Sequence, residues 1–129
     1  MKIQLAYRFT GENEEELIKQ LKKIKVVLEN NNHSTYIPIL DPKRSKEKKD
    51  LFLNTLKRLD SAEAILALIK SEEKSEGMLM EIGYAWGRDK KLILAINKDV
   101  KNTHLREFAD TIIEFSDINE LYEKLKNLK

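Results

Sequence analysis

Two short segments of this sequence carry side chains that could bind or attack a small molecule. In the first, Arg8, Phe9, Thr10 and Gly11 stand just before a glutamate-rich stretch with helical character. The free N–H groups and the positive end of a helix attract an anion, and an arginine adds a charge-assisted hydrogen bond. The segment therefore predicts an anion-binding loop. A simpler interpretation also fits, in which Thr10 caps the helix, Gly11 forms the turn and Arg8 faces solvent.

The second segment runs through residues 75–87 and contains one glutamate among apolar neighbours. Glu81 lies six residues after Ser75 and about one turn into a predicted helix. Its neighbours Met80, Ile82 and Tyr84 favour a partly buried carboxylate that faces a pocket. The alternative is that Glu81 is an ordinary surface residue of this helix.

The elements that must position these residues alternate between strands and helices. Short apolar or β-branched runs predict five strands, at residues 3–7, 34–40, 62–69, 92–96 and 111–115. Apolar residues at helical spacing predict four helices, at residues 13–30, 51–59, 78–87 and 117–128. Pro38 predicts that the second strand is an edge strand or ends early. Asp117 is the expected cap of the last helix, and Trp86 is expected on the inner side of the third, with Ile82 and Ala85.

This alternation predicts a single α/β domain over residues 1–129, with a parallel sheet and helices on both faces. Five strands in this rhythm favour a flavodoxin/Rossmann-like three-layer sandwich with strand order 2-1-3-4-5. In such a sheet ligands bind beyond the carboxyl ends of the strands, near the switch in strand order. The connections at residues 7–13, 70–77 and 97–102 meet there. Both chemically interesting segments are therefore expected at one edge of the sheet.

Composition excludes several classes of function. The 24 basic and 22 acidic side chains leave a net charge of +2, which argues against a nucleic-acid or membrane surface. The absence of cysteine excludes disulfides and thiolate metal sites, and only two histidines are present, which excludes a multi-histidine metal site. The N-terminal residues lack the pattern of a signal peptide, and no apolar run is long enough to span a membrane. A cytoplasmic protein is expected.

The block S-E-G-M-L-M-E-I-G-Y-A-W-G-R-D-K-K-L-I-L resembles the signature of the nucleoside 2-deoxyribosyltransferase family, which includes 2'-deoxynucleoside 5'-phosphate N-hydrolases. The residues that fit the signature in register are Ser75, Glu81, Gly83, Ala85, Gly87 and Lys91. The first strand and its loop, L-A-Y-R-F-T-G, stand where the family has an aromatic residue and a glycine-containing phosphate or sugar loop. The resemblance covers nearly the whole chain in order and spacing.

The resemblance implies cleavage of an N-glycosidic bond in a nucleoside or nucleotide. Glu81 would be the nucleophile at the anomeric carbon, and Tyr7 would orient it or touch the sugar. Ser75 and the N–H groups of Glu76 and Gly77 would hold a 5'-hydroxyl or 5'-phosphate, and Phe9 would stack on the base. Water would then release the sugar, or a second base would accept it. No metal or redox cofactor is implied.

The sequence departs from the family pattern at one position. The family has an Asp eight residues before the acidic residue that opens the third strand, but counting back from Glu63 reaches Thr55, with Asn54 beside it. Asp41 and Asp50 are both candidates to replace that carboxylate. The missing Asp puts the usual substrate in doubt.

Family members are typically dimers or higher oligomers in which a neighbouring subunit closes the site. Asn102, which precedes Leu105 and Arg106, stands at the position of the residue that the neighbour donates. The apolar residues of the predicted 78–87 helix also spread around more than one stripe, so a homodimer is expected.

Two other functions remain open at this point. One is a TIR-like NAD glycohydrolase, which also combines a flavodoxin-like sheet with one catalytic glutamate. The other is a non-catalytic nucleotide-binding or signalling module, which the missing Asp would favour.

Overall fold

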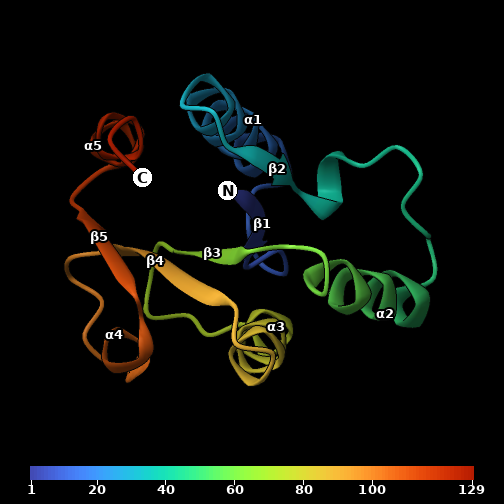
Figure 1. The fold of residues 1–129 in the computed structure, drawn as a ribbon. Coiled ribbons are helices and arrows are strands. Elements are labelled where there is room, and N and C mark those ends of the chain that lie inside the picture. Colours follow the sequence, from blue (N-terminus) through green and yellow to red (C-terminus); the bar gives the residue numbers. More distant parts are fainter.

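A computed structural model describes residues 1–129, and its centre is one five-stranded parallel sheet (Figure 1). The order of its strands is β2-β1-β3-β4-β5, as the sequence predicted. All four neighbouring pairs are parallel. The strands are β1 (Lys2–Tyr7), β2 (Ser34–Tyr36), β3 (Ala64–Ile69), β4 (Lys91–Asn97) and β5 (Thr111–Phe115).

Helices cover both faces of this sheet. In Figure 1, α1 and α5 lie on one side, and α2, α3 and α4 lie on the other. The helices are α1 (Glu14–Asn30), the 3-10 helix η1 (Pro38–Leu40), α2 (Lys48–Leu59), α3 (Glu76–Gly87), α4 (Leu105–Phe108) and α5 (Ile118–Leu125). The α/β three-layer prediction is confirmed, although the single turn of α4 was expected to be loop.

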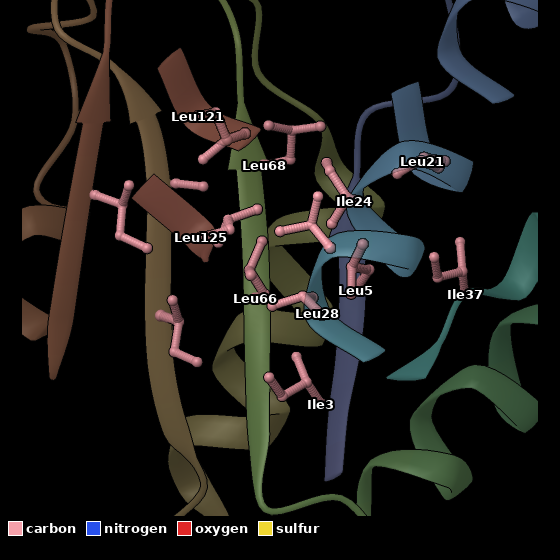
Figure 2. Close-up of a cluster of buried hydrophobic side chains, with 14 of the residues drawn as sticks. Ile3, Leu5, Leu21, Ile24, Leu28, Ile37, Leu66, Leu68, Leu121 and Leu125 are labelled. Carbon is pink, nitrogen blue, oxygen red and sulfur yellow. The ribbon is translucent and has the colours of Figure 1, made fainter. Parts of the chain in front are cut away.

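The core consists of two hydrophobic clusters, one on each face of the sheet. Side chains alternate along β1 and β3, so Leu5 and Leu66 face α1 and α5, whereas Ala67 on β3 faces α3. Figure 2 shows the first cluster, in which Leu21, Ile24 and Leu28 of α1 meet the sheet beside α5. Every side chain of β3 is buried, as expected for the central strand of a parallel sheet.

The second strand is shorter than predicted. It pairs with β1 only from Ser34 to Tyr36, and the chain then turns into η1 at Pro38. Proline has no N–H to donate to a strand ladder, but its fixed φ suits the first position of a helix. The prediction of a strand through residue 40 was therefore wrong, while the early end that Pro38 suggested was right.

The inner face of α3 also differs from the prediction at one residue. Its buried side chains are Met78, Ile82 and Ala85, which follow a single helical stripe. Trp86 was predicted to share this stripe, but it is 59% exposed. It lies one residue beyond the stripe, where the helix turns it away from the sheet. The predicted cap of the last helix is confirmed, because Asp117 accepts a hydrogen bond from the Glu120 N–H at 3.0 Å.

None of the helices combines the length and the apolar character that crossing a bilayer requires.

Candidate active site

A cleft of about 1030 Å³ opens beside the carboxyl end of β1 and the start of α3, the helix that follows β3. These two strands are neighbours, but the chain leaves them in opposite directions across the sheet, which makes this the switch point in strand order. One wall comes from the end of β1 and the start of α3. The other comes from η1, the connection at residues 41–47, and α2. Of the three connections expected to meet at the site, those at residues 7–13 and 70–77 contribute to the cleft, but the one at residues 97–102 does not line it.

Glu81 lies in this cleft on the first turns of α3, where it is half-buried. Its carboxylate forms no ion pair or side-chain hydrogen bond within the chain. Burial raises the pKa of this carboxyl to about 7. A carboxylate that is desolvated and lacks a cationic partner is destabilised in its charged form, which suits a nucleophile.

Ser75 caps α3 at the edge of the same cleft. Its Oγ accepts a hydrogen bond from the Met78 N–H at 3.2 Å, which leaves the hydroxyl proton free to reach a ligand. The next two residues, Glu76 and Gly77, also line the cleft. As the first residues of a helix, they have N–H groups without an acceptor inside it. The start of α3 therefore offers hydrogen-bond donors close to Glu81.

Tyr7 enters the cleft from the end of β1. Its hydroxyl oxygen accepts a hydrogen bond from the Ile39 N–H at 2.9 Å, so the phenol is held in place and keeps its own proton for donation. Burial raises the pKa of Tyr7, and the nearby charge of Glu81 raises it further, although the bond from Ile39 opposes both. Phe9, 48% exposed, and Thr10 follow on the same wall.

Three residues that the sequence placed at the site lie outside the cleft: Arg8, Gly11 and Asn102. Arg8 forms an ion pair with Glu12 at 2.9 Å and packs over Gly11 beside it. The backbone N–H of Asn102 donates to Glu72 at 3.3 Å, and its carbonyl oxygen accepts from Lys74, so its own chain does not place it near Glu81.

The simpler interpretation of the first loop is correct only in part. Gly11 does form a turn, with a φ of +85° that side chains disfavour. Thr10 does not cap α1, because Asn13 accepts the capping hydrogen bond from the Glu16 N–H at 2.9 Å. Arg8 does not simply face solvent, because it is paired with Glu12.

The position of the missing family Asp is occupied by a side chain without acid chemistry. Thr55 is buried at the back of the cleft, and its hydroxyl donates to the Leu51 carbonyl at 2.9 Å. Neither Asp41 nor Asp50 lines the cleft. The Asp41 carboxylate accepts hydrogen bonds from the Tyr36 hydroxyl and the Lys43 N–H, which lower its pKa. No aspartate of this chain replaces the one that is missing.

Sequence reasoning missed the second wall of the cleft. Arg44, Lys46 and Lys48 bring three positive charges to it, and Phe52 on α2 adds an aromatic ring. The lysine-rich composition of residues 41–50 was visible in the sequence. Only the path of the chain through η1 shows that this segment faces Glu81. The structure contains no group of three or more His, Asp or Glu side chains that could hold a metal ion.

Comparison with known families agrees with this geometry. Residues 6–120 match the family model described as nucleoside 2-deoxyribosyltransferase. The chain therefore belongs to the nucleoside 2-deoxyribosyltransferase family, which is a family of enzymes. This membership favours deoxyribosyl chemistry over the TIR-like and non-catalytic alternatives. A search of curated protein sequences finds no match.

Solved structures of similar fold extend over almost the whole chain. A CMP N-glycosidase from Clostridium botulinum has a TM-score of 0.69 at 18% identity, with 97% of each chain covered. A 2-deoxyribosyltransferase from Bacillus psychrosaccharolyticus has a TM-score of 0.68 at 22% identity, with 100% of this chain and 93% of that chain covered. A 2-deoxyribosyltransferase from Leishmania mexicana has a TM-score of 0.68 at 16% identity, with 99% of each chain covered. At these identities the likeness establishes the fold.

Proposed function

We propose that this enzyme cleaves or transfers the N-glycosidic bond of a deoxynucleoside, a nucleoside or a nucleoside 5'-monophosphate, with Glu81 as the nucleophile. The observation that carries the proposal is a half-buried carboxylate without a cationic partner, in a cleft at the switch point of the sheet. Nucleosides and nucleotides are metabolites of the cell interior, and we propose that the enzyme acts in the cytoplasm.

The reaction proceeds in two displacements. A Glu81 oxygen attacks C1' of the sugar as the bond from C1' to the base nitrogen breaks, and the electron pair of that bond leaves with the base. Water or a second base then attacks C1', and the bond to Glu81 breaks to restore the carboxylate. The first outcome is hydrolysis and the second is transfer.

The other residues of this wall hold the substrate. The Ser75 hydroxyl and the N–H groups of Glu76 and Gly77 bind the 5'-hydroxyl or 5'-phosphate, because they are free donors at a helix start. The Tyr7 hydroxyl donates a hydrogen bond to the Glu81 carboxylate or to the sugar. Phe9 stacks on the base from the rim of the cleft. Thr10 and Gly11 shape the loop that carries Phe9, and Arg8 supports it through Glu12.

The activity of the enzyme should depend on pH through the ionisation of Glu81. Only the ionised form of Glu81 can attack, and its pKa is raised to about 7. The kcat/KM value of the wild-type enzyme should therefore rise with pH up to about 7 and level off above it.

The direct test compares three variants in an assay of base release from nucleosides and nucleoside monophosphates. Glu81→Gln and Glu81→Ala should lose at least about 10³-fold in activity, as expected when a nucleophile is removed. Glu15→Gln, which changes an exposed carboxylate on α1, should retain full activity. Full activity in the Glu81 variants, with the fold intact, would remove Glu81 from the mechanism.

We also propose that the enzyme is a homodimer in which Asn102 reaches the site of the partner. Trp86 on α3 and Phe108 on α4 form an exposed aromatic pair, with ring centroids 6.0 Å apart, and Ile112 on the edge strand β5 is 44% exposed. A second copy is the simplest way to cover this surface. Asn102 lies outside the cleft of its own chain. If it contributes to catalysis, it must therefore do so in the cleft of the neighbouring subunit.

Light scattering and complementation test this assembly together. The wild-type protein should have twice the mass of the 15.1 kDa chain. Mixing inactive Glu81→Gln with a weakened Asn102→Ala should recover activity, because a mixed dimer contains one site with both native residues. A monomer of full activity would contradict the proposal.

A further inference from the structure

The charges of the cleft are distributed unevenly between its two walls. The only carboxylates that line it, Glu76 and Glu81, both belong to α3. All of its cations, Arg44, Lys46 and Lys48, lie on or next to the 41–47 connection and the start of α2. Lys46 and Lys48 are exposed and form no ion pair or hydrogen bond within the chain. The cleft therefore has a negative wall and a positive wall.

Lys48 stands on the side of α2 that faces the start of α3. Lys48, Phe52 and Thr55 recur at helical spacing, and all three line the cleft. Phe52 also packs against the start of α3, since a Cβ added at Gly77 would meet its ring at 3.6 Å. The same helical face thus carries an ammonium group toward the mouth of the cleft.

The proposed reaction moves negative charge from one wall toward the other. Before the reaction the charge is on Glu81, where burial destabilises it. When the bond from C1' to nitrogen breaks, the charge passes to the departing base. Positive groups fixed where negative charge develops stabilise the transition state.

The departing base also needs a proton, and the cleft has few groups that can give one. Thr55 donates its hydroxyl proton to a backbone carbonyl, and Asp41 lies outside the cleft with its carboxylate already hydrogen-bonded. Tyr7 belongs to the wall of the nucleophile. Glu76 is exposed at the first turn of α3, on the same wall as the nucleophile.

We propose that Lys48 is the general acid that protonates the leaving base, with Lys46 and Arg44 adding positive charge around it. This role rests on the proposed function. As the bond from C1' to nitrogen breaks, the base nitrogen takes a proton from the Lys48 ammonium group, which becomes a neutral amine. In the second step water gives its oxygen to C1' and one proton to this amine, and the Glu81 carboxylate is released.

The test compares substrates that differ in how much they need an acid. The assay measures single-turnover base release from a purine nucleoside and from its 7-methyl derivative, whose base departs without taking up a proton. Lys48→Gln should slow release of the unmodified base by roughly 10²- to 10⁴-fold, the usual contribution of a general acid. The same variant should cleave the 7-methyl substrate within a few-fold of the wild-type rate.

A matched control is next along the chain. Lys49 is also exposed and unpaired, but it does not line the cleft, so Lys49→Gln should cleave both substrates at the wild-type rate. Equal slowing of both substrates by Lys48→Gln would overturn the acid role. A rise in KM confined to 5'-monophosphates would also overturn it, because Lys48 would then bind phosphate.

Failure of the proposed function would look different. In that case the wild-type enzyme would release no base from either substrate, or Glu81→Gln would cleave the 7-methyl nucleoside as fast as the wild type. If the proposed function holds, Glu81→Gln loses both substrates while Lys48→Gln loses only the unmodified one.

Discussion

The two walls of the cleft are built in different ways. The wall with Glu81 and Tyr7 consists of the end of a buried strand and the start of a helix that packs on the central strands. The wall with Lys46 and Lys48 begins with a 3-10 turn and continues through an exposed connection into α2. The first wall lies directly on the core, whereas most residues of the 41–47 connection in the second wall are exposed.

We infer from this difference that the two walls have different roles. A nucleophile must be held firmly at the reacting carbon, which a helix start anchored by Met78 and Ile82 provides. The opposite wall must admit the base and release it, which an exposed connection allows. We therefore expect substitutions at the start of α3 to alter stability and chemistry together, and substitutions of the exposed lysines on the other wall to alter activity alone.

The largest expected effect is the change in the free energy of unfolding when Glu81 is replaced. The raised pKa means that the protein is most stable when Glu81 is protonated, and that this stability is lost as pH rises from about 4.5 through about 7. Glu81→Gln should therefore raise the free energy of unfolding by about 2 to 3 kcal/mol at pH 8 and hardly change it at pH 4. Urea denaturation at the two pH values measures the difference. A pH-independent change would show that burial does not perturb this carboxyl.

The second effect concerns Ser75 and the position of the anion. Ser75→Ala should lower kcat/KM for a 5'-monophosphate by roughly 10- to 100-fold, as expected for the loss of a hydrogen bond worth about 1.5–3 kcal/mol. It should also destabilise the fold by about 1 kcal/mol, because α3 loses its cap. Arg8→Ala is the comparison, and its effect should be smaller because the guanidinium is paired with Glu12. Steady-state kinetics with matched nucleosides and monophosphates decide whether either residue recognises phosphate.

The smallest expected effect is on KM, when one aromatic residue from each wall is removed. Phe9 and Phe52 both line the cleft, and stacking on one base is worth about 0.5–1.5 kcal/mol. Phe9→Ala and Phe52→Ala should each raise KM by about 2- to 10-fold with little change in kcat. Only Phe52→Ala should lower the melting temperature, because its ring also packs against the start of α3. An unchanged KM in one variant would show that the base contacts only the opposite wall.

The same contrast explains how much could be predicted from the sequence. The Glu81 wall was predictable because regular elements fix it. The apolar run of residues 3–7 placed Tyr7 at the end of β1, the helical pattern of residues 78–87 placed Glu81 inside α3, and the spacing from Ser75 to Glu81 fitted the family signature. The lysine wall was not predictable, because the path of residues 37–47 depends on η1, which forms where Pro38 ends the strand ladder. Trp86 was predicted on the wrong side of α3, because apolar character alone does not distinguish a core residue from one on an exposed surface.

The most direct test of Glu81 as the nucleophile is to trap the covalent intermediate. A 2'-fluoro nucleoside carries an electron-withdrawing group that slows release of the sugar, so an ester at the nucleophile should accumulate. Mass spectrometry of the intact protein and its peptides should find one fluorinated sugar on the peptide that contains Glu81, and none on Glu81→Gln. Base release with no adduct, or an adduct on another residue, would contradict the assignment of Glu81 as the nucleophile.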